Sequence, residues 1–410
     1  MRQFRIALLH YTCPPIVGGV EEIIRQHASL FKRHNHTVKV LAGDGAIFAD
    51  EYDVQIYPLL SSRNPRVIQI QNSLPESSKD LESCTEEIFT LLAGALEPFE
   101  VLFAHNVLTM PYNLPLTLAL HRLASDERIR VVSWNHDSPY FYDSPPLDMG
   151  ADQWNILKEY NPDVFYVTIS EERRREFEDL YGVTGLDVIP DGIDPVTFFN
   201  LSPGTARIIA EKDLLECDLL MVQPSRLHPR KNIELSIQVV KALHKKGLHA
   251  RLLLTGAHDP HEERITEYYR ELRRLSKRLQ IENDILIAAE YFCDSGEDLT
   301  GDTIEVRDFY LIADVLFIPS LQEGFGIPLL EAGMLKLPII CSDIPPFREI
   351  GQENVQYFSL KDSPDQIADK ILAFVSDLKP HRMFRNMLQN YLWDDIYHHM
   401  LSPLLERIFP

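Results

Sequence analysis

Residues 315–341 read VLFIPSLQEGFGIPLLEAGMLKLPIIC, and this stretch predicts a strand, a loop, a helix and a second strand in succession. The apolar run Val315 to Pro319 has the length of a buried strand, and a helix is expected from about Ile327 to Leu335. Pro338 to Cys341 is again a short apolar run. A strand followed by a helix and a further buried strand is the repeating unit of parallel α/β sheets.

The same unit recurs along the chain in two successive groups, which are joined near residues 195–215. Phe4 to Leu9 opens the first group and Leu219 to Gln223 the second. Further strands are expected at Thr37 to Ala42, Val101 to Ala104, Arg130 to Ser133, Val164 to Ile169, Arg251 to Thr255 and Ile285 to Ala289. The pattern predicts two doubly wound, Rossmann-like sheets. Ligands of such sheets bind at the carboxyl ends of the strands, so a site is expected in a cleft that two such domains face.

The composition is that of a globular protein with an acidic balance. Of 410 residues, 45% are apolar and 25% charged, and 40 Lys and Arg against 61 Asp and Glu give a net charge of −21. Such a charge argues against nucleic acid and against an anionic membrane surface as partners, because both attract basic proteins. Neither a membrane span of ~18 apolar residues nor a signal peptide is found. A soluble, cytoplasmic protein is therefore expected.

The cysteines agree with that expectation. There are five, and none forms a CxxC pair: Cys13, Cys84, Cys217, Cys293 and Cys341. Dispersed and odd in number, they are typical of reduced thiols in the cytosol, and no metal cluster is expected. The acidic segment Cys293 to Thr303 is interpreted as a solvated loop.

The loop within residues 320–331 has the chemistry of a ligand site. Gly324 and Gly326 allow the backbone to approach a ligand, and the following helix offers N–H donors to negative charge. Glu323 lies in the loop and Glu331 in the helix, so two carboxylates could hold two parts of one ligand. A glycine-rich connection with two solvated glutamates is the alternative.

A second candidate lies between the strand at Leu219 to Gln223 and the next helix, where residues 225–232 read SRLHPRKN. Arg226 and Lys231 on such a loop could clamp a diphosphate, Arg by its planar fork and Lys as a point charge. The alternative is a surface basic cluster. The loop at 225–232 follows the carboxyl end of a strand, where ligands of such sheets bind, and this position favours the diphosphate site.

Polar residues also follow two strands of the first group. His136 could donate to a substrate oxygen or relay a proton, and Asp137 could fix its tautomer if the fold brings the two together. His105 and Asn106 occupy the same kind of strand end, and Asn113 could shape a pocket wall. A structural role for each histidine is the alternative.

Gly18 and Gly19 precede the first helix, so this helix start too could offer backbone N–H groups to a negatively charged ligand, although turns explain most such glycine pairs. The sequence contains no GxGxxG fingerprint and no GxxxxGK[ST] loop, which argues against dinucleotide binding of that type and against a nucleoside triphosphatase. It also lacks GxSxG and HExxH, so serine-hydrolase and zinc-protease chemistry have no support.

Taken in order, these blocks resemble those of the GT-B glycosyltransferases of family GT4, the retaining, sugar-nucleotide-dependent "glycosyl transferases group 1". The matching blocks are GGVE at 18–21, HTV at 36–38, VIPDGID at 188–194, SR…KN at 225–232, ADVLFIPS at 313–320 and the E-x7-E signature at 323–331. The resemblance implies an acceptor-side domain at 1–200, a nucleotide-sugar domain at 201–385, and a C-terminal helix at 386–410 that crosses back. Asp191 stands where the family usually has Asn, and the Tyr- and Pro-rich 138–149 has no family counterpart and suggests an acceptor-side loop.

The resemblance also implies roles for single residues. Arg226 and Lys231 would hold the donor diphosphate, and Glu331 the ribose. Catalysis would rest on Glu323, at the sugar hydroxyls, and on His136, near the anomeric centre. Backbone N–H groups would come from Gly324, Phe325 and Gly326, with Gly18 and Gly19 approaching the phosphates. Independently of the resemblance, the polar residues at the strand ends are expected to contact the acceptor: His105, Asn106, Asn113 and Asp137.

The expected reaction is hexosyl transfer with retention, from UDP- or GDP-hexose of glucose or mannose type to a small soluble acceptor such as a sugar, sugar phosphate or polar organic acid. No bound cofactor and no metal are expected, since cationic side chains and helix ends can neutralise the leaving group. Two alternatives keep the fold: a sugar-nucleotide epimerase or phosphorylase, and a non-catalytic binding protein.

Overall fold

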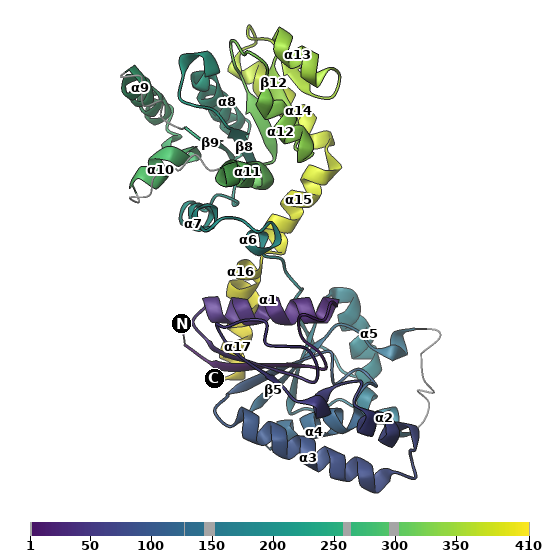
Figure 1. Cartoon of the computed structure of the whole chain (residues 1–410). Helices are drawn as coiled ribbons and strands as arrows, with labels where there is room; N and C mark the ends of the chain where they lie inside the picture. Colours follow the sequence, from purple (N-terminus) through teal and green to yellow (C-terminus); the bar gives the residue numbers. More distant parts are fainter. Residues whose placement is uncertain (1, 127, 143–151, 257–263, 295–302, 410) are drawn as a thin grey trace. The chain divides into compact units, whose positions relative to one another are not determined.

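A computed structural model describes residues 2–126, 128–142, 152–256, 264–294 and 303–409. Most of the predicted acidic loop at 293–303 and the second half of the predicted acceptor-side loop at 138–149 lie outside these residues. The chain divides into two compact units, Met1–Ile193 with Tyr391–Pro410, and Asp194–Asn390 (Figure 1). Each contains one parallel sheet, so the predicted two-domain α/β fold is confirmed.

The first unit is built on seven parallel strands in the order β3-β2-β1-β4-β5-β6-β7. The strands are β1 Arg5–His10, β2 Thr37–Ala42, β3 Asp53–Ile56, β4 Val101–His105, β5 Arg130–Asn135, β6 Val164–Thr168 and β7 Asp187–Val188. Its helices are α1 Gly19–Arg33, α2 Pro65–Asn72, α3 Ser78–Leu96, α4 Leu114–Ser125 and α5 Glu171–Tyr181. The strand order reverses between β1 and β4, so the loops after these strands meet at the ligand edge of the sheet.

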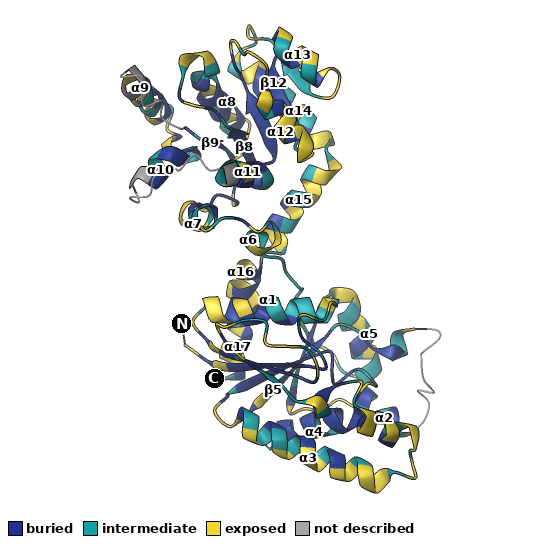
Figure 2. Ribbon diagram, viewed as in Figure 1, coloured by how far each residue is buried: buried dark blue, intermediate teal, exposed yellow. Residues whose placement is uncertain are grey.

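Both faces of this sheet are covered, because successive side chains of a strand point to opposite faces. Ala7 and Leu9 pack with the core under α2 to α5, whereas Ile6 and Leu8 pack with α1 and the C-terminal segment. Figure 1 shows α3 and α4 on one side of the sheet and α1 with α17 on the other. The central strands are buried and the outer faces of the helices are exposed (Figure 2).

The C-terminal segment completes the first unit. It contains α16 Trp393–Ile396, a π-helical turn at Tyr397–Leu401 and α17 Ser402–Ile408. Trp393 is buried and its ring lies 4.6 Å from that of His27 in α1, while Tyr397 Oη lies 2.7 Å from His36 Nε2. The segment is joined to the loop after β7 by Ile193 N, which donates to Tyr391 O at 2.7 Å.

The second unit is built on six parallel strands in the order β10-β9-β8-β11-β12-β13. They are β8 Leu219–Gln223, β9 Ala250–Leu254, β10 Ile285–Ile287, β11 Val315–Ile318, β12 Ile339–Ser342 and β13 Gln356–Phe358. The helices are α6 Pro195–Phe198, α7 Pro203–Lys212, α8 Ile233–Lys245, α9 Arg264–Arg278, α10 Ala288–Asp294, α11 Thr303–Ile312, α12 Ile327–Met334, α13 Pro345–Gly351, α14 Pro364–Asp377 and α15 Lys379–Asn390.

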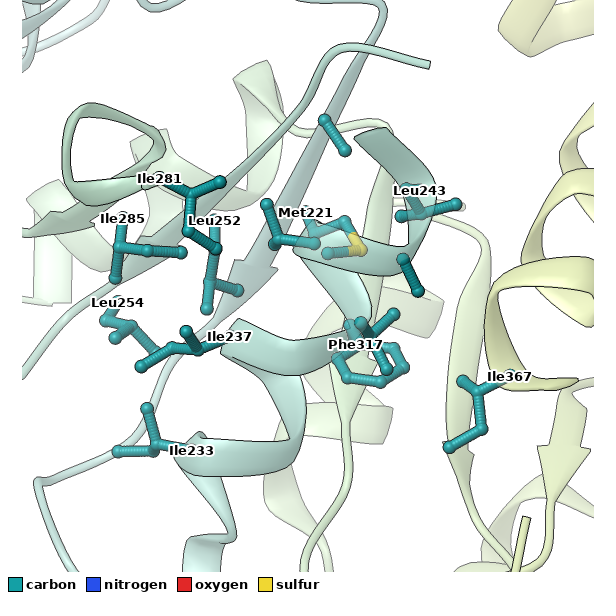
Figure 3. Packing of buried hydrophobic residues seen from close by; sticks show 14 of the residues in the cluster. Met221, Ile233, Ile237, Leu243, Leu252, Leu254, Ile281, Ile285, Phe317 and Ile367 are labelled. Atoms are coloured by element: carbon teal, nitrogen blue, oxygen red, sulfur yellow. The ribbon is translucent and has the colours of Figure 1, made fainter. Parts of the chain in front are cut away.

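One face of this sheet carries an apolar core shared with α8, α9 and α14. In Figure 3, Ile233 and Ile237 of α8 lie beside Leu252 and Leu254 of β9, with Phe317 of β11 close by. Burying one such side chain contributes about 1.5–3 kcal/mol. The core therefore holds β8 against β11 and fixes the loops at their carboxyl ends.

Four of the cysteines, Cys13, Cys84, Cys217 and Cys341, are buried free thiols, as expected; the Cys293 side chain lies outside the description. Among the described residues we find no helix with the length and apolar character that a membrane span requires.

Candidate active site

The loop after β8 places Lys231 at the ligand edge of the second sheet. Pro229–Lys231 forms a single 3-10 turn, and Asn232 adopts a left-handed conformation (φ 53°) before α8 begins at Ile233. Gln223 Nε2 donates to Lys231 O at 3.0 Å, and Asn232 Nδ2 donates to Pro319 O at 3.1 Å. These bonds fix the loop to β8 on one side and to the end of β11 on the other.

The loop after β11 brings Glu323 to the same place. Lys231 Nζ lies 2.5 Å from Glu323 Oε1, and the two side chains are only 15% and 10% exposed. Ser320 Oγ donates to the same carboxylate oxygen at 2.7 Å, and Arg230 Nη1 lies 4.0 Å from Oε2. The two loops that the sequence singled out separately thus form one site, with a carboxylate held between cationic side chains.

The start of α12 leaves backbone accessible beside this pair. A Cβ on Gly324 would meet nothing within 4 Å, so a ligand can approach the backbone there. Gly326 has φ +116° and caps the helix, and a Cβ there would lie 3.1 Å from the Phe347 ring. The Phe325 side chain is 54% exposed. The free N–H groups of a helix start favour negatively charged groups.

Glu331 lies in the second turn of α12 and does not join the Lys231–Glu323 pair. Its Oε2 accepts from Tyr310 Oη at 2.6 Å, and Tyr310 is buried on α11. Arg226 is exposed on the loop after β8. The structure thus brings together Lys231 and Glu323 directly, and places Arg226 and Glu331 on the same two loop–helix segments.

In the first unit, His136 follows β5 and meets a residue that the motif analysis did not include among the site residues. Its Nδ1 lies 3.5 Å from Asp191 Oδ2, and Trp134 Nε1 donates to Asp191 Oδ1 at 3.3 Å. Burial lowers the pKa of His136 to about 4 and raises the pKa of Asp191 to about 6. Asp191 belongs to the VIPDGID block at 188–194, which begins at the last residue of β7, and this block was the one sequence feature that pointed to it.

The Asp137 side chain contacts Tyr142 and Arg173, and not the ring of His136 whose tautomer it was expected to fix. Its Oδ2 accepts from Tyr142 Oη at 2.5 Å, and its Oδ1 lies 3.3 Å from Arg173 Nη2 of α5. Asn106 (φ 51°) accepts at Oδ1 from the backbone N–H groups of both His136 and Asp137, at 3.2 and 3.1 Å. Asn106 therefore holds the loop that carries His136.

His105 and Asn113 are fully buried. Asn113 caps α4 by accepting from Leu116 N at 3.1 Å, and its Nδ2 donates to carbonyls of Leu59 and Ser61. The His105 ring lies 5.0 Å from His27 and 6.3 Å from His136, and burial holds its pKa well below the usual value. Both side chains therefore belong to the packing under the site.

Gly18 and Gly19 stand at the start of α1. Gly18 is extended (φ −169°), and a Cβ there would lie 2.1 Å from Glu21 Oε2, whereas one on Gly19 would meet nothing within 4 Å. Glu21 in turn accepts from Thr12 Oγ1. At Gly18 a side chain would displace only the flexible end of Glu21, whereas the space beside Gly19 is open, so a ligand could approach the backbone there.

Two family models match the chain, one in each unit. The model described as "Glycosyltransferase Family 4" matches residues 17–196, and that described as "Glycosyl transferases group 1" matches residues 206–390. The chain belongs to glycosyltransferase family 4. The family resemblance is confirmed, and with it the two-domain GT-B fold and the activity of a hexosyltransferase that depends on a sugar nucleotide.

Curated relatives of this glycosyltransferase include two mannosylglucosylglycerate synthases. The protein of Thermotoga maritima is 24% identical over 87% of this chain and 85% of its own length. That of Petrotoga mobilis is 25% identical over 66% of this chain, and the match spans 65% of its length. A serotype-specific mannosyltransferase of Escherichia coli, WbdA, is 30% identical over 35% of the chain and 16% of its length.

Solved structures with a similar chain include the sucrose-phosphate synthase of Thermosynechococcus elongatus, which is 16% identical over all of this chain and 99% of its own, with a TM-score of 0.41. A score this low adds nothing to the fold assignment, which rests on the two sheets and the family models.

Proposed function

We propose that this enzyme transfers a hexosyl group, with retention, from a nucleoside-diphosphate sugar to a small polar acceptor. The observation that supports this most is the ion pair of Lys231 and Glu323 at the ligand edge of the second sheet. It sets a cation suited to a diphosphate beside a carboxylate suited to sugar hydroxyls, within the region that the group 1 model matches. This arrangement is what a donor site needs.

In the proposed reaction, the bond between the anomeric carbon and the diphosphate oxygen breaks while the acceptor hydroxyl attacks the same face. The acceptor proton passes to the departing diphosphate. Arg226, Lys231 and the N–H groups of Gly324 to Gly326 stabilise the negative charge that develops there. Glu323 holds the sugar hydroxyls, and Glu331, oriented by Tyr310, holds the ribose.

In the first unit, Gly19 offers backbone to the phosphates, while His136 contacts the sugar near its anomeric carbon. Asp137 and Asn106 position the acceptor side of the site, Asn106 through the loop that it holds. We propose a cytoplasmic enzyme with a soluble acceptor, because a net charge of −21 opposes approach to an anionic bilayer.

The names of the relatives favour mannose as the transferred hexose. The product that the two synthases are named for contains mannose, glucose and glycerate, which would form by mannosyl transfer to glucosylglycerate. We therefore propose a short anionic glycoside of this type as the acceptor.

A thermal-shift panel with UDP, GDP and their glucose and mannose derivatives tests the donor, since a ligand at 100 times its Kd stabilises by ~2.7 kcal/mol. Transfer to glucosylglycerate, followed by NMR of the new anomeric centre, tests the reaction and its stereochemistry. Conversion of the sugar nucleotide without any acceptor would instead indicate an epimerase, and no stabilisation by any member of the panel would indicate a protein without donor binding.

Replacing Lys231 by Ala is expected to weaken the binding of the sugar nucleotide and of the free nucleoside diphosphate together, by about 10- to 100-fold. This is the size of one charge-assisted hydrogen bond to phosphate. Calorimetric titration of both ligands measures it. Lys245→Ala is the matched control, because Lys245 is an exposed lysine at the end of α8, the helix that follows Lys231. A change in acceptor affinity alone would contradict the assignment.

Activity is expected to survive EDTA. Arg226, Lys231 and the start of α12 are proposed to neutralise the leaving group, and the chain has no DxD block at a strand end. The measurement is the initial rate after treatment with EDTA and removal of the chelator. A loss of activity that Mg²⁺ or Mn²⁺ restores would overturn this proposal.

A further inference from the structure

The contacts of His136 decide which of its nitrogens carries the proton. Nδ1 faces the Asp191 carboxylate at 3.5 Å, whereas Nε2 is buried and has no partner among the described residues. A proton on Nδ1 would lie toward this carboxylate, at a separation longer than an ordinary hydrogen bond. A proton on Nε2 would bury an unpaired N–H and set the Nδ1 lone pair against negative charge, and each of these is costly. These two costs favour the neutral ring with its proton on Nδ1.

Asp191 is itself held firmly. Trp134 Nε1 donates to its Oδ1 at 3.3 Å, which leaves Oδ2 for His136. The next residue, Gly192, packs so closely on Trp393 that a Cβ would lie 2.8 Å from its ring, and Ile193 is bonded to the C-terminal segment. The aspartate thus sits on a loop that two separate parts of the first unit fix.

We infer that Asp191 is a positioning residue for His136, holding the proton on Nδ1 so that the bare Nε2 accepts a hydrogen bond from a hydroxyl of the bound sugar. This inference rests on the proposed function, in which His136 contacts the sugar. It gives Nε2 the partner that this atom lacks among the described residues. His136 then acts as an acceptor and not as a donor.

Other charged and titratable groups lie near the ring, and the charge of Asp137 raises the pKa of His136 against the larger lowering by burial. Asp137 is engaged by Arg173 and Tyr142. The neighbouring histidines are kept neutral, because burial lowers the pKa of His10 to about 4, of His27 to about 3, and of His105 well below its usual value. Asp191 is the carboxylate that faces His136 Nδ1.

The arrangement predicts a pH dependence. Burial raises the pKa of Asp191 to about 6, so its carboxylate is charged at pH 8 and takes up a proton as the pH falls through 6. A protonated carboxyl donates to Nδ1 and drives the ring proton to Nε2, which removes the acceptor. Transfer activity is therefore expected to fall on the acid side of pH 6.

Asp191→Asn tests the inference, because the Asn Oδ1 can still accept from Trp134. We expect kcat at pH 8 to fall about 10- to 100-fold, the size of one hydrogen bond to a charged group, and the acid limb near pH 6 to disappear. Asp191→Glu should recover part of the activity and the limb. Asp187→Asn is the matched control, a part-exposed carboxylate of β7 that pairs with Arg407, and should leave the profile unchanged.

Long-range ¹H–¹⁵N NMR of the imidazoles gives a second readout that needs no turnover. It should show the Nδ1–H form of His136 in the wild type and a mixture with the Nε2–H form in Asp191→Asn. An unaltered tautomer and an unaltered pH profile in a folded Asp191→Asn would overturn the inference while leaving the proposed function intact. A wild type that shows the Nδ1–H form but transfers no hexose would refute the function and support the pairing.

Discussion

Glu323→Gln is expected to lower turnover by about 10²- to 10³-fold, the loss seen when one preorganised group that stabilises a transition state is removed. The amide keeps the shape of the side chain and can still accept from Ser320 Oγ, but it no longer offers negative charge to a sugar that becomes oxocarbenium-like. Single-turnover transfer with saturating donor measures the effect on the chemical step.

Affinity for the free nucleoside diphosphate should change little or rise in Glu323→Gln, because Lys231 loses its internal partner and becomes available to phosphate. Glu331→Gln provides the comparison, since its loss should weaken nucleotide binding first. Turnover of Glu323→Gln close to that of the wild type would contradict the role proposed for this carboxylate.

The strands at the centre of both sheets could be predicted from the sequence because burial on both faces leaves continuous apolar runs. Val101–His105 and Leu219–Gln223 are such runs, and every one of their residues is buried. The positions of the ligand loops then follow from the rule that parallel strands end at one edge. The loops carrying Lys231 and Glu323 were predicted in this way.

Three of the edge strands could not be predicted by the same reasoning, whereas the apolar edge strand β10 (Ile285–Ile287) was predicted. β3 (DVQI), β7 (DV) and β13 (QYF) are short, and each contains polar residues because one side of an edge strand is not covered by a neighbour. The strand predicted at 285–289 extends too far, since α10 begins at Ala288. A buried apolar run of this length does not distinguish a strand end from the first turn of a helix.

Pairings between distant loops depend on sheet order. Lys231 and Glu323 are 92 residues apart and meet because β8 and β11 are neighbours in the sheet. The contact of His136 with Asp191 likewise needs β5, β6 and β7 to lie in order. The sequence offered Asp137 as the closer partner along the chain, but its side chain turns to α5, where Arg173 supplies a charge.

Arg385→Met is expected to lower the free energy of unfolding of the second unit by about 3–5 kcal/mol, the cost of breaking a buried ion pair. Arg385, on α15, is 6% exposed and contacts the fully buried Asp314 through Nε at 2.8 Å and through Nη2. Its Nη1 donates to the carbonyls of Leu215 and Cys217. Removing the guanidinium leaves the buried Asp314 carboxylate without its paired charge, with Leu220 N and the nearby His381 ring as remaining contacts, and leaves two buried carbonyls without this donor.

Urea denaturation followed by far-UV circular dichroism measures the free energy of unfolding. Arg382→Met is the control, because Arg382 is an exposed arginine on the same helix; it should change the free energy of unfolding by no more than about 0.5 kcal/mol. The double variant Asp314→Asn/Arg385→Met separates lost charge pairing from lost packing. The Asn amide can still accept from Leu220 N, which now bonds Asp314 Oδ2 at 2.6 Å, while no charge remains buried. The double variant should therefore be more stable than Arg385→Met alone, and the opposite order would show that Arg385 acts through its carbonyl contacts and packing, not through its charge.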